Sequence, residues 1–440
     1  MAEIARLQAE KLRYLSLAKA MAIKATQKVP DQNLKGLLAQ QAFIFNTTYQ
    51  GEEFDPDVYD GLYYANKVLG DEATKSLEGH EKQIRGLISS VTGNHIYSGG
   101  TVGKILRWDM REGERVADTL SPTNEIHNIM TLAASPDNKW LAAGGQFSLI
   151  ANSPNYIQLF DLTTAAGSDP QRIDGWVGEV WDLDWTSDNR ALIGLDNGGR
   201  TIRMYDFNAV NAIIESSVKL NHIAVSPDHK WISGATADGK VIMWDRENNY
   251  ASKEFHTNNN PRDQVTSIAY SHDGKWFAAG DQEGRVFIWD LTQIDLLDVE
   301  QDYTPTQTLT DHNAAIKDLE FSFDGQFMAS ASLDKSVRLW NLDNLNDPPI
   351  VLADHDDWVH AIAFSPDNMQ LLAGTQDKAI RAWPTRIEAM SNNICRYISR
   401  NFSKAEWDIY VGTDLDYEKT CANFPLGEGV TDADLNKSNN

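Results

Sequence analysis

Residues 311–341 bring together the side chains of this chain that are best suited to chemistry. His312, Ser330, Ser332 and Asp334 lie in one short stretch that ends in Trp340. A histidine, a hydroxyl and a carboxylate at close range could carry out acid–base chemistry. The same groups could instead hydrogen-bond to one another inside a sheet, because the single N–H of a tryptophan is costly to bury without an acceptor.

The elements around these residues are three short strands, AIKDLEFS, QFMASAS and SVRLWN. Apolar residues alternate along each strand, and the polar turns SFDG and LDK separate them. A sheet of about thirty residues cannot bury its own apolar faces, so the pattern predicts further copies stacked beside it.

Copies of this unit are present along most of the chain, at a spacing of about 45 residues. Each is expected to end in an aromatic residue followed by Asp or a substitute: Trp108-Asp109, Phe160-Asp161, Tyr205-Asp206, Trp244-Asp245, Trp289-Asp290, Trp340-Asn341 and Trp383-Pro384. A polar turn precedes each of these ends, at residues 90–94, 135–138, 186–189, 226–229, 271–274, 322–325 and 365–368.

The aromatic–Asp ends and the polar turns recur together seven times, with the same relative placement. This pattern resembles that of the WD-repeat family. The resemblance implies an all-β fold, a seven-bladed β-propeller over residues 74–384. Residues 74–77 are then expected to pair as the outer strand of the last blade and close the ring. Residues 1–73 are expected to form a helical N-terminal segment, and 385–425 a C-terminal helical segment packing on the propeller. Residues 426–440 are expected to be a disordered tail.

The family's supporting hydrogen-bond network can be carried over residue by residue. The resemblance implies a structural role for His80, Trp108, Asp238, Trp244, His312, Asp334, Trp340, His355, Asp377 and Trp383. The first blade departs from the pattern, because Val102 stands where the turn aspartate belongs. On this interpretation the polar residues of 311–341 hold a blade together and carry no catalysis.

The segments on either side of the repeats resemble a second pattern. The N-terminal stretch SLAKAMAIKATQ, followed by LKGLLAQQAFIFN, and the C-terminal stretch NICRYISRNFSKAEWDIYVGTDLDYEKTCANFP are similar to segments that flank propellers in large bacterial signalling proteins. In such proteins an effector lies upstream, for example a STAND-type NTPase, a kinase or a caspase-like protease. The resemblance implies a covalently linked effector domain.

Composition excludes several classes of function. A net charge of −24 repels nucleic acid, and no apolar stretch is long enough to insert into a membrane. The absence of a signal peptide predicts a cytoplasmic protein, in which Cys395 and Cys421 are expected to be free thiols rather than one bridge. The loop SGGTVGKI lacks the residues of a phosphate-binding loop, and no pattern indicates a metal or a cofactor. The acidic insertion at 294–306 is expected to be a solvated loop.

The remaining candidates for function lie where each blade's inner strand begins, around the top entrance of the propeller. We expect a protein partner to bind through Arg85, Met130, Glu179, Trp181, Lys219, Lys317, Trp358 and His360. Tryptophan, arginine and methionine are enriched in protein interfaces. The alternative is that Trp181 and Trp358 fill gaps between blades.

The sequence therefore predicts a non-catalytic protein-binding or sensing module within a larger bacterial signalling protein. A second hypothesis is a structural scaffold subunit of a bacterial multiprotein or envelope machine, which would use the blade sides and the helices. A third is an enzyme acting through central carboxylates and metals.

Overall fold

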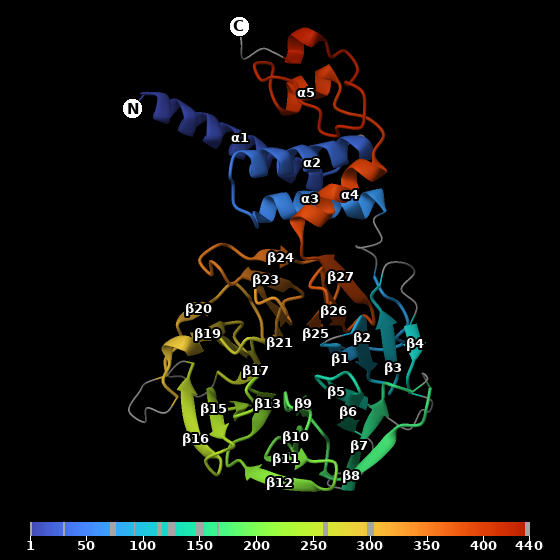
Figure 1. The fold of residues 1–440 in the computed structure, drawn as a ribbon, viewed down its shortest axis with the longest axis vertical. Coiled ribbons are helices and arrows are strands. Elements are labelled where there is room, and N and C mark those ends of the chain that lie inside the picture. The colour runs from blue at the N-terminus through green and yellow to red at the C-terminus, as the bar shows by residue number, and fades with distance from the viewer. Residues whose placement is uncertain are drawn as a thin grey trace. The chain divides into compact units, whose positions relative to one another are not determined.

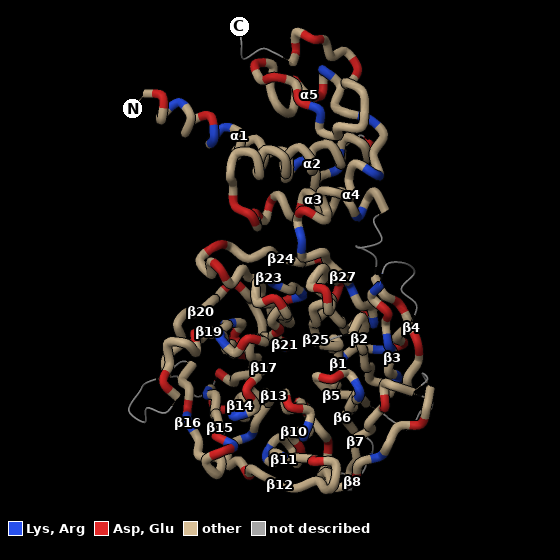
Figure 2. The backbone as a smooth tube through the Cα atoms, in the orientation of Figure 1, with Lys and Arg blue, Asp and Glu red and all other residues tan. Residues whose placement is uncertain are grey.

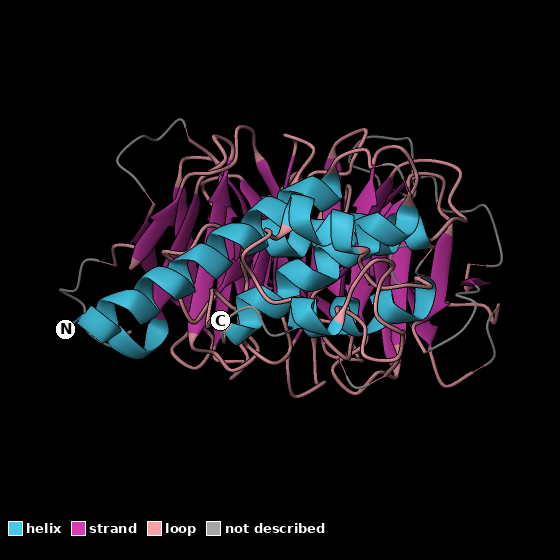
Figure 3. Cartoon of the chain, turned by 90° about the horizontal axis from the view of Figure 1, so that it is seen from above, coloured by secondary structure: helices cyan, strands magenta, loops and turns pink. Residues whose placement is uncertain are grey.

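The computed structural model describes residues 2–29, 31–70, 76–91, 93–111, 117–121, 128–146, 154–164, 167–257, 263–296 and 303–435. The chain folds into two compact units. One comprises residues 76–347 and 351–382, and the other comprises residues 1–75, 348–350 and 383–440. The α-helices belong to the second unit, and nearly all of the strands belong to the first. Figure 3 distinguishes helices from strands by colour.

The first unit is a β-propeller of seven antiparallel sheets, as predicted (Figure 1). Six sheets have four strands and the seventh has three. Blades one to three contain β1–β4 (Ile84–Ser89, His95–Gly100, Ile105–Asp109, Ala117–Thr119), β5–β8 (Asn128–Ala134, Trp140–Gln146, Pro154–Asp161, Gln171–Val177) and β9–β12 (Asp182–Trp185, Leu192–Asp196, Thr201–Tyr205, Val210–Glu215). Blades four and five contain β13–β16 (Leu220–Val225, Trp231–Thr236, Lys240–Asp245, Ala251–His256) and β17–β20 (Val265–Tyr270, Trp276–Asp281, Val286–Asp290, Gln307–Leu309). Blades six and seven contain β21–β24 (Ile316–Phe321, Phe327–Ser332, Val337–Asn341, Ile350–Leu352) and β25–β27 (Val359–Phe364, Gln370–Thr375, Ile380–Pro384).

The ring closes through its inner strands and through one outer bridge. Each inner strand (β1, β5, β9, β13, β17, β21 and β25) packs against the inner strands of the two neighbouring blades. Leu77 pairs with Ile380 of β27, with a distance of 2.8 Å from the Leu77 N to the Ile380 O. The predicted closure is thus confirmed at Leu77, while residues 74 and 75 lie outside the described residues. This bridge covers the outer edge of β27 at Ile380.

The polar turns between first and second strands also join neighbouring blades. Asn138, Asn189 and Asn368 adopt positive φ angles of 55°, 60° and 57°, which asparagine tolerates better than most residues. Their side-chain oxygens accept hydrogen bonds from backbone N–H groups in the preceding blade's turn, at 3.0, 2.9 and 2.8 Å respectively. The turns therefore set the blade spacing as well as reversing the chain.

In its described part, the second unit contains five α-helices: α1 (Ala2–Thr26), α2 (Gln32–Thr48), α3 (Pro56–Leu69), α4 (Ile387–Tyr397) and α5 (Lys404–Tyr410). Local capping explains where three of them begin. The Asp31 and Asp55 carboxylates accept from the Leu34 and Val58 N–H groups, at 2.8 and 3.1 Å. Ser403 and Glu406 form the capping box that the sequence predicts for α5.

The C-terminal segment packs against the N-terminal helices within this unit. The Asn66 side-chain amide donates to the Met390 backbone oxygen at 3.0 Å, and the Thr420 hydroxyl donates to Gln41 at 2.7 Å. Arg400 lies 2.9 Å from Asp31. These contacts join the N-terminal and C-terminal segments, which flank the propeller in the sequence.

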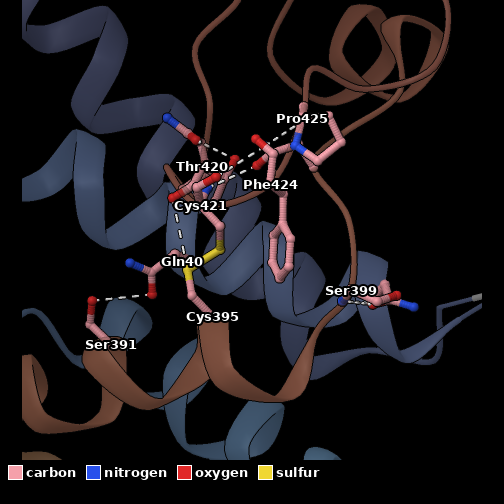
Figure 4. The surroundings of a disulfide bond; sticks show 11 residues. Gln40, Ser391, Cys395, Ser399, Thr420, Cys421, Phe424 and Pro425 are labelled. Atoms are coloured by element: carbon pink, nitrogen blue, oxygen red, sulfur yellow. Dashed lines mark hydrogen bonds between the residues drawn. A yellow bond between two sulfur atoms is a disulfide. The ribbon is translucent and has the colours of Figure 1, made fainter.

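Two expectations about this segment are wrong. Cys395 and Cys421 form a disulfide, with Cα atoms 5.8 Å apart, rather than two free thiols (Figure 4). The expected disordered tail is ordered over its described part, residues 426–435, which includes the short helix Asp432–Leu435. The Tyr417 N–H donates to the Asp434 backbone oxygen at 2.8 Å, and this bond holds the tail against the unit. Residues 436–440 lie outside the described residues.

Acidic side chains outnumber basic ones across both units (Figure 2). Among the described residues, no helix combines the length and the apolarity that crossing a membrane would require.

Candidate functional site

The His, Ser and Asp of the sixth blade form a closed hydrogen-bond network. His312 Nε2 lies 2.8 Å from Ser330 Oγ, and His312 Nδ1 lies 2.8 Å from the Asp334 carboxylate. Trp340 Nε1 donates to the same Ser330 Oγ at 2.9 Å. Ser330 is fully buried, so its hydroxyl cannot meet a substrate. The arrangement joins three strands and their turns, and it supports the structural interpretation of these residues.

The first blade has the same network without its aspartate. Ser98 Oγ lies 2.7 Å from His80 Nε2 and accepts from Trp108 Nε1 at 2.7 Å. Because Val102 occupies the aspartate position, His80 Nδ1 is buried with no hydrogen-bond partner among the described residues. Burial lowers the pKa of His80 to about 4, so the ring is neutral at pH 7.

The network takes another form in the fourth and seventh blades. The Asp377 carboxylate accepts from the Thr375 hydroxyl and pairs with Arg381 at 3.0 Å. In the fourth blade Asp238 accepts from the Thr236 hydroxyl at 2.6 Å. The other predicted network residues of these two blades, Trp244, His355 and Trp383, are buried.

Two buried ion pairs escaped the sequence analysis. Asp196 ends β10 and lies 2.6 Å from Arg203, and Asp281 ends β18 and lies 2.6 Å from Arg285. Both carboxylates are fully buried. The signal in the sequence is an aspartate at the end of the second strand, before the turn that carries the family's aspartate, followed by an arginine. These pairs stabilise blades three and five, where the His–Ser–Trp set is missing.

In the fifth blade, the acidic insertion supplies the hydrogen-bond acceptor for the buried tryptophan N–H. Trp289 Nε1 donates to the Tyr303 backbone oxygen at 3.1 Å, because Ala279 stands where the first and sixth blades have a serine. Tyr303 is buried and its ring stacks on Phe255 at 4.6 Å. The expectation of a solvated loop over 294–306 is therefore wrong at this end, while residues 297–302 lie outside the described residues.

Carboxylates on the inner strands join one blade to the next. Asp182 and Asp184 of the third blade accept from the Ile223 and Val225 N–H groups of the fourth, at 2.8 and 2.7 Å. Asp318 of the sixth blade accepts from the Ile362 N–H of the seventh at 2.9 Å. Because these carboxylates accept hydrogen bonds from the backbone of the next blade, their role is structural. This weakens the hypothesis of catalysis by central carboxylates.

The burial of Asp184 is expected to make the stability of the fold depend on pH. Burial raises its pKa from 3.8 to about 7, and Asp182 adds to the rise. Because the folded state then holds a proton that the unfolded chain releases, the associated stability is lost as the pH rises toward 7. When the pH is raised from 5 to 8, we expect the free energy of unfolding of the Asp184→Asn variant to increase by about 1–2 kcal/mol relative to that of the wild type.

Urea denaturation of both proteins at the two pH values measures this difference. Asp161→Asn is the matched control, because Asp161 is exposed and hydrogen bonds from Thr163 lower its pKa. Its effect should be the same at both pH values. A stability difference for Asp184→Asn that does not change with pH would contradict the assignment.

A β-bulge at the start of the inner strand positions the residues around the entrance. In six blades the register shifts by one residue there, as between Ile84 and Gly86 in β1. A bulge re-aims a side chain out of the normal alternation. The bulged residues are Arg85, Met130, Asn221, Thr266, Lys317 and His360.

A repeated hydrogen bond places a second set of residues on the same face. In five blades, the N–H of a residue in the second turn donates to the backbone oxygen two residues before the bulge. In the seventh blade the Gln376 N–H donates to the Trp358 oxygen at 3.0 Å, and the same bond recurs at Gln83, Lys219, Gln264 and Ala315. We call the surface made by these residues, the bulged residues and the second turns the top face.

The two predicted tryptophan anchors differ in their surroundings. Trp181 is partly buried and packs against the apolar core between blades three and four. The Nζ of Lys219 lies 5.0 Å from the centre of its ring. Trp358 is 44% exposed and contacts His360 edge-on, with ring centres 6.4 Å apart. Trp358 is therefore the aromatic side chain that this face offers to a partner.

The other predicted residues of the top face are available to different degrees. Lys219 is exposed, whereas Met130, Glu179, Arg85, Lys317 and His360 are partly buried. Across the described part of the chain, no three His, Cys, Asp or Glu side chains are placed to hold a metal ion.

Comparison with known proteins identifies the repeats. The family model described as WD domain, G-beta repeat matches residues 212–245, 252–290, 303–341 and 346–384. The chain is also similar to the guanine nucleotide-binding protein subunit beta of Schizosaccharomyces pombe (strain 972 / ATCC 24843), with 28% identity over 142 residues. The aligned part covers 32% of this chain and 42% of that relative, so the chain matches less than half of the relative's length. WD40 repeats in a seven-bladed propeller support the WD-repeat propeller family.

Proposed function

We propose that this WD40-repeat propeller is a non-catalytic module that captures a protein partner on its top face. The observation that carries the proposal is Trp358, a large aromatic side chain left 44% exposed beside the bulged residues. Exposed aromatic side chains near the centre of a surface are typical anchors of protein interfaces. The buried networks of the blades supply the rigid frame that such a surface needs.

The name of the relative supports this proposal, because it describes a subunit and therefore a protein that assembles with others. The protein-binding role also agrees with the occupied carboxylates of the inner strands. We propose further that the propeller belongs to a larger bacterial signalling protein with an upstream effector domain. That part rests on the resemblance of the two flanking segments.

The disulfide bears on where the protein works. The predicted cytoplasmic location agrees with free thiols, whereas a disulfide between Cys395 and Cys421 favours an oxidising compartment. Mass spectrometry of the protein from its natural source, without reduction, distinguishes the two.

Replacing Trp358 by Ala tests the proposed binding surface. We expect partner binding to weaken by about tenfold to a hundredfold, because the substitution removes an exposed aromatic anchor. The melting temperature should stay nearly unchanged, since the side chain is 44% exposed. Affinity capture from the natural source, quantified against the wild type, measures the binding, and thermal unfolding measures the stability.

Met369→Ala is the matched control. Met369 is 39% exposed in the turn at the other end of the same inner strand, so its loss should not affect capture. Equal capture by wild type and Trp358→Ala would contradict the proposal.

A further inference from the structure

Three neighbouring blades carry a basic or ring-nitrogen side chain at the bulge. They are Arg85 on β1, Lys317 on β21 and His360 on β25. The three strands are consecutive around the ring, because β25 packs between β21 and β1. We call these three residues the mouth cluster. Trp358, two residues before His360, lies beside it.

The bulged residues of two other blades show what this position does when it serves the fold. Asn221 in the fourth blade donates to the Val265 backbone oxygen of the fifth at 2.8 Å. Thr266 in the fifth blade donates to the Ile316 backbone oxygen of the sixth at 2.6 Å. The amide of Asn221 and the hydroxyl of Thr266 thus bond to the next blade.

The mouth cluster does not follow this pattern at its two cations. Within the described ranges, Lys317 makes no hydrogen bond or ion pair, and the buried Nε of Arg85 has no acceptor. Only His360 is held in place, with its Nε2 2.8 Å from the Gln83 amide nitrogen and 3.3 Å from Gln376. Burial, and then the charge of Arg85, lower the pKa of Lys317.

Arg246 and Arg338 also have a buried Nε without an acceptor, but each donates another N–H to a backbone oxygen, at 2.6 and 2.7 Å. Among the described residues, Arg85 and Lys317 have neither a backbone acceptor nor an ion pair, although carboxylates are frequent in this chain. It has 63 acidic and 39 basic residues, and three other partly buried arginines each have a carboxylate within 3.0 Å. Removing a cation from water is costly unless an anion compensates it. The Asp318 carboxylate lies near enough to raise the pKa of Lys317 in part, but among the described residues no carboxylate forms an ion pair with Arg85 or Lys317.

We propose that the mouth cluster binds a carboxylate side chain, Asp or Glu, from the protein partner, while Trp358 packs against an apolar residue of the same segment. The inference rests on the proposed function of the top face and specifies its partner. Arg85 can donate two parallel hydrogen bonds to a carboxylate, and Lys317 can add a third. Asp318 and Asp357 adjoin the cluster in sequence and favour a singly charged carboxylate over a doubly charged phosphate.

Selection from a random peptide library displayed on phage, with the full chain as bait, tests this inference. We expect the selected peptides to share an Asp or Glu next to an apolar residue. Arg85→Gln with Lys317→Gln should weaken the binding of a selected synthetic peptide by about tenfold to a hundredfold. Raising the salt concentration should weaken the binding to the wild type as well.

The matched control is the pair Lys139→Gln and Arg190→Gln, which removes the same charge from turns at the other end of the inner strands. This pair should leave the peptide affinity unchanged. Circular dichroism establishes that each variant is folded, and Arg85→Gln alone, with an expected loss of about tenfold, replaces any double variant that unfolds.

The possible results separate the two proposals. Peptides that depend on Trp358 but share no acidic residue would overturn the mouth cluster as a carboxylate site and leave the top face intact. Selected peptides that bind equally well to Trp358→Ala, or a selection that yields no binder, would contradict both. A phosphoserine version that binds more tightly than the glutamate version would overturn the carboxylate assignment.

Discussion

Removing the Cys395–Cys421 disulfide is expected to destabilise the helical unit by about 3.5 kcal/mol. The bridge closes a loop with a sequence separation of 26 residues, and the cost follows from the entropy that an open loop of this length regains on unfolding. The bridge fixes the C-terminal loop to α4. Asn401 supports the same loop, because its side-chain amide donates to the Cys421 and Pro425 backbone oxygens at 3.1 and 2.9 Å.

The double variant Cys395→Ala with Cys421→Ala measures this effect by urea denaturation under oxidising conditions. Adding a reductant should shift the wild type to the stability of the variant and leave the variant unchanged. These are the two cysteines of the chain, so a thiol titration in denaturant should find none before reduction and two after it. Two reactive thiols in the unreduced protein would contradict the bridge.

Replacing Ser330 by Ala is expected to destabilise the propeller by about 2–4 kcal/mol. One hydroxyl serves both His312 and Trp340, so its removal leaves two buried polar groups without a partner. Both side chains are almost completely buried, and water cannot replace the missing oxygen without opening the blade.

Ser267→Ala is the matched control for this prediction. Ser267 is also fully buried, but its hydroxyl has no hydrogen-bond partner among the described residues. The same substitution there should be neutral or slightly stabilising. Equal losses of unfolding free energy for Ser330→Ala and Ser267→Ala in urea denaturation would contradict this prediction. They would mean that the hydrogen bonds of the sixth blade add nothing to the packing of a buried hydroxyl.

The seven blades could be predicted because their signals are local and repeated. A polar turn and an aromatic–Asp end recur in phase, and each depends on residues close together in the sequence. The caps at Asp31, Asp55 and Ser403 are local in the same way, and the structure has all three. Closure of the ring through Leu77 followed from counting strands.

The features that escaped prediction depend on contacts between distant residues. Cys395 and Cys421 carry no signal of their pairing until the C-terminal segment folds back on α4. Tyr303 replaces a missing serine through its backbone oxygen, which no side-chain pattern reveals. The inner-strand carboxylates bind backbone N–H groups of the next blade, so their partners cannot be read from residue types.

The places of the candidate residues along their blades could be predicted, whereas the exposure of their side chains could not. The phase of the repeats placed Trp181 and Trp358 at equivalent ends of their blades, and packing then separated them. Trp181 fills a space between blades, as the alternative interpretation held, whereas Trp358 remains 44% exposed. Exposure depends on neighbouring side chains, which a single repeat does not specify.

The most direct test of the account is site-specific photo-crosslinking in the natural source, with a photoreactive amino acid at position 358 or at position 369. The account predicts a discrete crosslinked protein from position 358, on the top face, and none from position 369, at the opposite end of the same strand. The position 358 product should also decrease when Arg85 and Lys317 are replaced by Gln. Crosslinking from position 369 alone would show that the partner binds another face and would contradict the central claim.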